Sequence, residues 1–218
     1  YQSRGLGDVY KRQSLYIDIN FFTVLMESSK KLFLLDAYAL IYRGYYAFIK
    51  NPRINSKGTD TSAILGFMNS LLEIIRTQNP DYIAVAFDKG GSITRSEMFT
   101  EYKSNRDKTP EPILVAIPYI KEILNSMNIS ILEKEGYEAD DIIGTVAKDA
   151  EKNNFKVYMV TPDKDFAQLV SDNIFLCKPA RMGNSMEIWG VDEVKERFEV
   201  DSPEPVSYTH LRAHETDR

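Results

Sequence analysis

The stretch GYEADD, residues 136–141, brings Glu138, Asp140 and Asp141 close together in the chain. Like charges at this spacing repel one another, so a folded chain that holds them together usually supplies a cation or a basic partner. Carboxylate oxygens are also the ligands that hard cations such as Mg²⁺ and Mn²⁺ prefer. Taken alone, the three acids are explained equally well as the first turn of a helix, where negative charge interacts favourably with the helix dipole.

Further acids stand where predicted strands end. The run KLFLL, residues 31–35, is continuously apolar, which is typical of a strand buried on both faces, and Asp36 follows it directly. Asp88 and Asp163 end two more predicted strands. In a parallel α/β sheet, ligands bind beyond the carboxyl ends of the strands. We therefore expect seven carboxylates to converge at that edge: Asp36, Asp88, Glu138, Asp140, Asp141, Asp163 and Asp165.

The elements that position these acids alternate along the chain. Strands are predicted at 31–35, 82–88, 129–133, 156–163 and, as an edge strand, 173–177. Helices are predicted at 37–48, 59–78, 113–127, 137–153, 164–170 and 191–198. This alternation predicts an α/β fold with a mainly parallel central sheet and helices on both faces.

Seven carboxylates in one pocket cannot all ionise without cations. Because the ligands are all oxygens, they select hard divalent cations, Mg²⁺ or Mn²⁺ in preference to Ca²⁺. Two such ions about 4 Å apart suit phosphodiester hydrolysis, one activating water and the other stabilising the leaving oxygen. A single Asp at a strand end is more often a helix cap, but acids in four separate segments favour a metal centre.

The segment 89–112 is basic and contains aromatic residues. Its cations and rings include Arg95, Phe99, Tyr102, Lys103, Arg106 and Lys108. Cations hold phosphates, and an aromatic ring stacks on an unpaired base. The alternative is a solvated loop of mixed charge, because Glu97, Glu101 and Asp107 lie in the same segment. Its position directly after Asp88 favours contact with a nucleic acid.

The composition limits the class of protein. The chain has 218 residues, a formal net charge of −5 and one cysteine, Cys177, so no internal disulfide is possible and we expect a cytoplasmic setting. We also expect a monomer. No apolar run approaches the ~20 residues of a membrane span, so we expect no membrane partner. The negative charge disfavours broad coating of nucleic acid and still permits a basic groove beside an acidic site.

The two ends of the sequence differ from the rest. Residues 3–13 and 206–216 can be encoded by opposite strands of one DNA element that resembles a sequencing-library adapter. We therefore interpret 1–13 and 206–218 as translated adapter and 1–25 as a lead before a natural start at Met26. The alternative for 14–25 is a genuine strand or a short signal-like segment. The expected domain is 26–205.

Four long motifs resemble a known family. They are LFLLDAYALIYRGYYAF, AVAFDKGGSITRSEMFTEYKSNRDKTPE, GYEADDIIGTVA and TPDKDFAQLVSDNI. Their order is similar to that of the 5′-nuclease domain at the N-terminus of bacterial DNA polymerase I, within the flap endonuclease superfamily. The resemblance covers about 31–200.

The resemblance implies a PIN-like (resolvase-like) fold with a basic helical arch, two divalent cations, and cleavage of 5′ ends and 5′-flap DNA in replication and repair. The seven acids named above fall on the family's metal ligands. The DNA-binding positions implied are Arg43, Arg95, Tyr102, Lys103 and Arg106. Lys103 and Arg106 are also implied to be catalytic, since they would steer the scissile phosphate to the metals. The implied setting is a bacterial, nucleoid-associated cytoplasmic protein whose full-length chain carries polymerase domains.

One departure from the family affects the expected activity. The family continues into a helix–hairpin–helix segment preceded by a Gly-Asp-x-x-Asp-Asn stretch with further metal ligands, whereas this chain reaches DSPEP at 201–205 and then the tail. We therefore expect the domain to be incomplete at its C-terminus and the second metal site to be incomplete too. The alternatives to a 5′ nuclease are a PIN-type ribonuclease, and a DNA-binding module or inactive fragment without catalysis.

Overall fold

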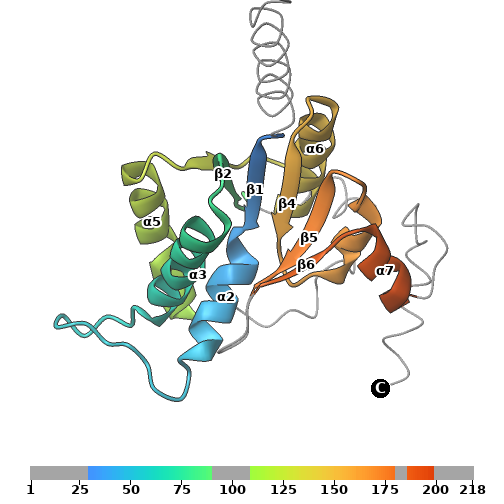
Figure 1. The fold of residues 1–218 in the computed structure, drawn as a ribbon. Helices are drawn as coiled ribbons and strands as arrows, with labels where there is room; N and C mark the ends of the chain where they lie inside the picture. Colours follow the sequence, from blue (N-terminus) through green and yellow to red (C-terminus); the bar gives the residue numbers. More distant parts are fainter. Residues whose placement is uncertain (1–28, 90–108, 180–185, 199–218) are drawn as a thin grey trace, which may run out of the picture.

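The structure, a computed structural model, describes residues 29–89, 109–179 and 186–198. Its elements (Figure 1) are β1 (Lys31–Asp36), α2 (Ala37–Ala47), α3 (Ser62–Gln78), β2 (Tyr82–Ala86), α5 (Glu111–Ser126), β3 (Ser130–Leu132), α6 (Ala139–Lys152), β4 (Lys156–Val160), the 3₁₀ helix η1 (Lys164–Leu169), β5 (Ile174–Lys178), β6 (Glu187–Trp189) and α7 (Val191–Phe198). The expected adapter-like ends, the basic helical arch and the predicted site residues Arg95, Tyr102, Lys103 and Arg106 lie outside the described residues.

The strands form one six-stranded sheet in the order β3-β2-β1-β4-β5-β6. The first five strands are parallel, and β6 pairs with β5 in the antiparallel direction. The most apolar strand, β1, lies between β2 and β4, where both of its faces are covered. Phe33 and Leu35 belong to one core and Leu34 to the other, and all three are fully buried. The α/β fold with a mainly parallel sheet is confirmed.

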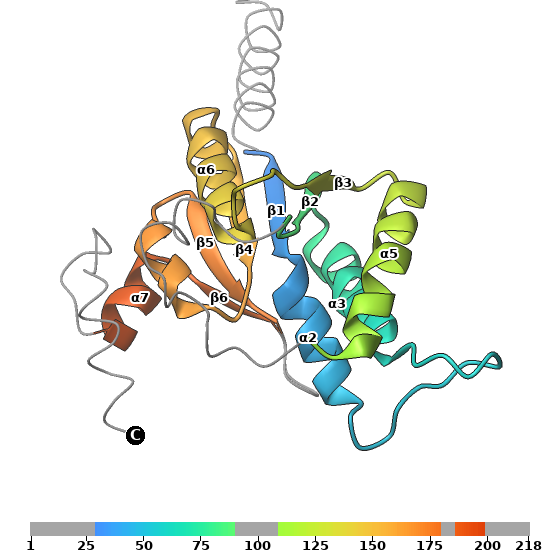
Figure 2. The same cartoon turned by 180° about the vertical axis from the view of Figure 1, so that it is seen from behind.

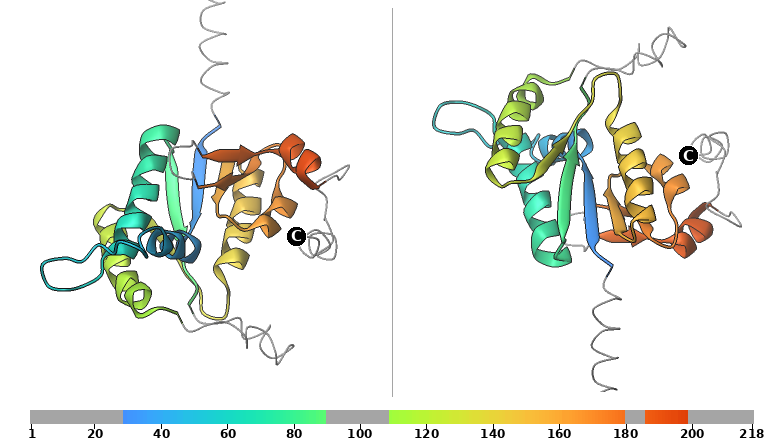
Figure 3. Two further views of the ribbon diagram at one scale, coloured as in Figure 1. Left: turned by 90° about the horizontal axis from the view of Figure 1, so that it is seen from below. Right: turned by 90° about the horizontal axis from the view of Figure 1, so that it is seen from above.

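Two layers of helices cover the sheet. The side chains of α2, α3 and α5 pack on one face, and those of α6, η1 and α7 pack on the opposite face. The two views in Figure 3 show these two layers on either side of the sheet, and Figure 2, which shows the molecule from behind, turns the layer that contains α6 toward the viewer. Because β1 to β5 are parallel, their carboxyl ends lie along one side of the sheet, which we call its carboxyl edge. Helix α2, η1 and the chain after β2 begin there.

Helices α2 and α3 meet backbone to backbone. A Cβ added to Gly66 would lie 2.2 Å from the Cα of Gly44, and a Cβ added to Gly44 would lie 2.9 Å from the Cα of Gly66. No side chain fits at either position, so two glycines are needed where the helices cross. This contact fixes α2, and therefore Asp36 at its N-terminus, against the rest of that layer.

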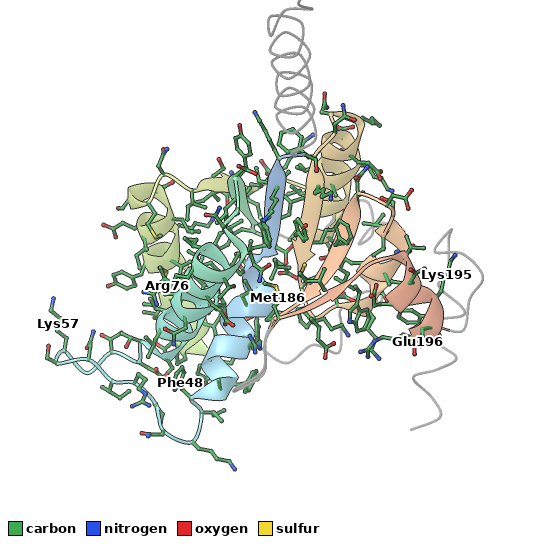
Figure 4. The ribbon with its side chains drawn as sticks, in the orientation of Figure 1. Phe48, Lys57, Arg76, Met186, Lys195 and Glu196 are labelled. Carbon is green, nitrogen blue, oxygen red and sulfur yellow. The ribbon has the colours of Figure 1, made fainter. Side chains whose placement is uncertain are left out.

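The connection between α2 and α3 projects from the domain. Asn55 N donates to Thr59 O at 2.9 Å, Thr61 N donates to Arg53 O at 2.8 Å, and an isolated antiparallel bridge joins Ile54 and Asp60. Figure 4 shows Lys57 at its far end and Phe48 at the end of α2. These hydrogen bonds use the residues at 59–61, so the helix predicted from 59 begins at Ser62 instead.

The expectation that 173–177 forms an edge strand is wrong. Strand β5 lies between β4 and β6, and β6 is the edge. The edge is held in place by the buried Trp189, whose ring centroid lies 3.7 Å from the Lys178 Nζ and 4.3 Å from the Arg197 Cζ. Three residues are too short a strand to show a pattern in the sequence.

Strand β4 ends earlier than the predicted strand 156–163. The N–H of Thr161 still donates to Cys177 O at 3.1 Å, but Pro162 has no N–H to donate, so the ladder stops there. The chain then turns, which leaves Asp163 free of the sheet and at the start of η1. None of the helices that the structure describes is long and apolar enough to cross a membrane.

Candidate metal centre

The three strand-end acids each accept a hydrogen bond from the start of a helix. Asp36 Oδ1 accepts from Ala39 N at 3.0 Å in α2, and Asp163 Oδ1 accepts from Asp165 N at 2.9 Å in η1. Asp88 Oδ1 accepts from Ala139 N, the first residue of α6, at 2.6 Å. Asp36 and Asp163 are therefore helix caps, and Asp88 ties the end of β2 to the helix that carries Asp140.

A buried hydroxyl joins two of these acids. Thr161, which is 0% exposed, donates from Oγ1 to Asp36 Oδ2 at 3.1 Å. The same oxygen accepts from Asp163 N at 3.2 Å. The end of β1 and the turn after β4 are thus connected through one side chain.

The charges of the acids act on one another. Partial desolvation, and then the negative charges of Asp36, Asp163, Asp88 and Glu138, raise the pKa of Asp140 from 3.8 to about 7. The Asp140 side chain is nevertheless exposed to solvent. A cation bound beside it would offset the repulsion from the neighbouring carboxylates and so lower its pKa again. The four named neighbours and Asp140 come from β1, the end of β2, the N-terminus of α6 and the turn after β4.

Asp36 is the most enclosed of the strand-end acids, with 8% of its surface exposed. Burial raises its pKa, and so do the charges of Asp88 and Asp163, while the hydrogen bonds from Ala39 and Thr161 act in the opposite direction. A buried carboxylate with two donors keeps one orientation. The orientation of this carboxylate is therefore set by the protein before any cation binds.

The N-terminus of α6 combines a cap with an acidic first turn. Glu138 is the N-cap, is 5% exposed, and donates from its N to Asp141 Oδ2 at 3.3 Å. Asp140 and Asp141 lie in the first turn and Lys152 lies in the last, which agrees with the helix dipole. The helix-dipole explanation of GYEADD is therefore confirmed, while the metal-ligand interpretation stays a prediction.

The side chains do not enclose a ready ion site. Within 29–89, 109–179 and 186–198, no three His, Cys, Asp or Glu side chains are close enough together to hold a metal ion. The hydrogen bonds to backbone N–H groups explain this spacing, since they direct Asp36, Asp88 and Asp163 toward different helix starts. The donor atoms and their charge fit a divalent cation, and binding one requires the carboxylates to close around it.

The remaining predicted residues lie close by in the chain. Asp165 is the second residue of η1, and its backbone contacts Asp163. Arg43 is half-buried on α2, which Asp36 caps. Another strand-end acid, Glu133 after β3, pairs with Lys121 at 2.5 Å instead of joining the charges around Asp140.

Two neighbours of the acids were missed by sequence reasoning. Thr161 is one, and its position two residues before Asp163 is a signal for a turn in which a hydroxyl binds the backbone. Tyr38 is the other. Burial, and then the charges of Asp88, Tyr42 and Glu133, raise the pKa of Tyr38, so its phenol stays protonated beside Asp88.

Comparison with known proteins identifies the family. A family model described as "5′-3′ exonuclease, N-terminal resolvase-like domain" matches residues 31–199. The chain belongs to the 5′-3′ exonuclease family. The resolvase-like fold expected from the motifs is thereby confirmed. In this 5′-3′ exonuclease domain, the acids after three of its strands accept hydrogen bonds from the starts of helices.

Comparison with curated relatives shows how much of their length this chain covers. The chain is 37% identical over 188 residues to a 5′-3′ exonuclease of Aquifex aeolicus, a match that covers 86% of this chain and 63% of the relative. It is 36% identical over 193 residues to DNA polymerase I of Bacillus subtilis, covering 88% of this chain and 22% of that protein. The chain thus spans less than two thirds of the exonuclease and about a fifth of the polymerase.

Solved structures share the fold. The bacteriophage T5 5′-exonuclease with zinc bound has a TM-score of 0.60 at 17% identity, over 80% of this chain and 63% of that one. A T5 flap endonuclease in a complex with DNA and metal ions has a TM-score of 0.60 at 20% identity, over 80% of this chain and 62% of that one. At these identities the comparison supports the architecture of the 5′-3′ exonuclease domain.

Proposed function

We propose that the chain is the catalytic part of a divalent-metal-dependent 5′ nuclease, which hydrolyses phosphodiester bonds at 5′ ends and flaps of branched DNA. The observation that carries the proposal is that hydrogen bonds bring acids from separate segments together at the carboxyl ends of the strands: Asp88 accepts from Ala139 N at the start of α6, and Thr161 joins Asp36 to Asp163. Family membership and relatives named 5′-3′ exonuclease and DNA polymerase I support the choice of substrate. Bound metal ions and DNA in the T5 structures support the cofactor and the partner.

The residues that would hold the cations are Asp36, Asp88, Glu138, Asp140, Asp141, Asp163 and Asp165. When bound, two Mg²⁺ or Mn²⁺ ions supply activation of water and stabilisation of the leaving oxygen. Asp36 and Asp163 are held in place by helix N–H groups and by Thr161. Asp140 projects from the first turn of α6 into the same group of charges, where a neutral side chain would lower the negative charge available to the cations.

The proposed DNA contacts come from two regions. Arg43, on α2, extends the site from Asp36 toward the substrate backbone, and Lys103 and Arg106 orient the scissile phosphate. Arg95 and Tyr102 complete the proposed contacts with the single-stranded 5′ end. In a full-length chain we propose polymerase domains as partners within the same polypeptide, and a cytoplasmic location in a bacterium.

The test is cleavage of a 5′-labelled DNA flap by the chain extended to the length of its Aquifex-type relatives. We expect short 5′ products with Mg²⁺ or Mn²⁺ and none after EDTA, and a decrease of at least about 100-fold in kcat for Asp140→Ala, because metal-ligand loss removes stabilisation of the transition state. Asp149→Ala is the matched control, since Asp149 is an exposed acid of the same helix that pairs with Lys152.

Two results would contradict the proposal. One is an extended chain that cuts no flap at any concentration of either cation. The other is Asp140→Ala cutting as fast as Asp149→Ala. A parallel RNA flap separates DNA cleavage from a ribonuclease of the same fold.

A further inference from the structure

We propose that Thr161 is a positioning residue of the proposed metal centre, which sets the orientation of the Asp36 carboxylate and of the Asp163 turn from which these acids close around a cation. This inference rests on the proposed function. It concerns an uncharged residue whose hydroxyl is already occupied by hydrogen bonds to Asp36 and to Asp163 N. Its effect would be exerted through the two acids.

Thr161 is fixed from three sides. Its backbone N donates to Cys177 O in β5 at 3.1 Å, its hydroxyl donates to Asp36 Oδ2 in β1 at 3.1 Å, and its hydroxyl oxygen accepts from Asp163 N at 3.2 Å. Since Asp163 N can only donate, the single hydroxyl proton is available for Asp36. The directions of the two bonds are therefore determined by chemistry.

The same chain of hydrogen bonds continues into η1. Asp163 N donates to Thr161, and Asp163 Oδ1 accepts from Asp165 N at 2.9 Å. One hydroxyl thus sets the orientation of Asp36 and the start of the turn that carries Asp163 and Asp165. Residues that orient metal ligands in this way typically change metal affinity by about 10- to 100-fold when they are replaced.

A purely structural role is the competing explanation, because Thr161 is fully buried. In that role its methyl group would contribute packing, and loss of packing would lower stability without changing the affinity for a cation. Three replacements separate the two roles. Thr161→Val keeps the shape and removes the hydroxyl, Thr161→Ser keeps the hydroxyl and removes the methyl, and Thr161→Ala removes both.

The experiment measures Mn²⁺ binding to the 218-residue chain by the electron paramagnetic resonance signal of free Mn²⁺, with urea unfolding in EDTA measured alongside. We expect Thr161→Val to weaken Mn²⁺ binding by about 10-fold or more, and Thr161→Ser to bind within about 3-fold of the unchanged chain. Should Thr161→Val not fold, Thr161→Ser and Thr161→Ala, which differ from each other only in the hydroxyl, give the same comparison. Thr77→Val is the control, because Thr77 donates to Glu73 O at the far end of α3.

A double-mutant cycle tests whether Thr161 acts through Asp36. In an Asp36→Asn background, Thr161→Val should weaken Mn²⁺ binding by much less than in the unchanged chain, since residues that share one interaction are not additive. The inference is overturned if the unchanged chain binds Mn²⁺ and Thr161→Val binds it equally well; the proposed function then stands. If the unchanged chain binds no Mn²⁺, the inference fails, and flap cleavage by the extended chain decides the proposed function separately.

Discussion

At the scale of single residues, the strand-end acids perform a structural task and are available for a chemical one. Asp36 and Asp163 cap α2 and η1, and Asp88 accepts from the N-terminus of α6. These caps orient the carboxylates without neutralising them, so their charges still act on Asp140. The helix cap and the metal ligand are therefore compatible functions of the same side chain.

The first prediction concerns the repulsion among these charges. In EDTA at pH 8, we expect Asp140→Asn to be more stable than the unchanged chain, because the substitution removes one charge from a group of like charges. Asp140 is exposed, so solvent screens the gain, and we expect no more than about 1 kcal/mol in the free energy of unfolding. Urea unfolding at pH 8 and at pH 4 measures it.

The direction of the pKa shift of Asp140 determines how the stability gain of Asp140→Asn depends on pH. The pKa of Asp140 is raised in the folded chain from 3.8 to about 7, so the folded state binds the proton more tightly than the unfolded state does. The contribution of this group to stability is fully present below about pH 4 and is lost as the pH rises through about 7. An advantage of Asp140→Asn that is as large at pH 4 as at pH 8 would contradict this explanation.

The residues of the site differ in how far the sequence could predict them. The acids were predictable because they follow apolar runs or begin an amphipathic helix. Thr161 was not, because its partner Asp36 is 125 positions away and is reached only when β1 pairs with β4. A hydroxyl without a charge gives no sign in the sequence of a contact at that separation.

At the scale of elements, α2 is placed by its contact with α3. Gly44 and Gly66 meet there without space for a side chain on either helix. Helical periodicity predicted both helices, but it could not predict that they cross at two glycines, because the crossing depends on the sheet beneath them. The start of α3 was predicted three residues early for a related reason, since the antiparallel pairing of the preceding connection uses those residues.

The second prediction tests that crossing. We expect Gly66→Ala to destabilise the domain by about 1–3 kcal/mol or more, because its Cβ would lie 2.2 Å from backbone and would force the helices apart. Gly144→Ala is the matched control, since its Cβ would approach only the end of the Leu169 side chain, at 3.2 Å, and a helical Gly→Ala change gains about 1 kcal/mol of propensity. Urea unfolding compares the two, and equal effects would contradict the close contact.

At the scale of the whole molecule, the fold brings segments far apart in the chain to one edge of a parallel sheet. The alternation of apolar runs and amphipathic helices was sufficient to predict this layout. A strand buried on both faces needs a layer of helices on each side, which is the arrangement of a parallel α/β sheet. The antiparallel edge at β6 could not be predicted, because its three residues are held by side-chain contacts of Trp189 with β5 and α7. The grouping of the acids is thus a consequence of topology, while the orientation of each carboxylate depends on individual hydrogen bonds.

The central claim is that the carboxyl edge of this sheet binds divalent cations. The most direct measurement is anomalous X-ray scattering from crystals of this chain grown with Mn²⁺, recorded at the manganese absorption edge. We predict a peak within about 2.5 Å of carboxylate oxygens from at least two of Asp36, Asp88, Asp140 and Asp163, with those side chains drawn together around it. A crystal that holds Mn²⁺ elsewhere and shows no peak between these acids would contradict the account.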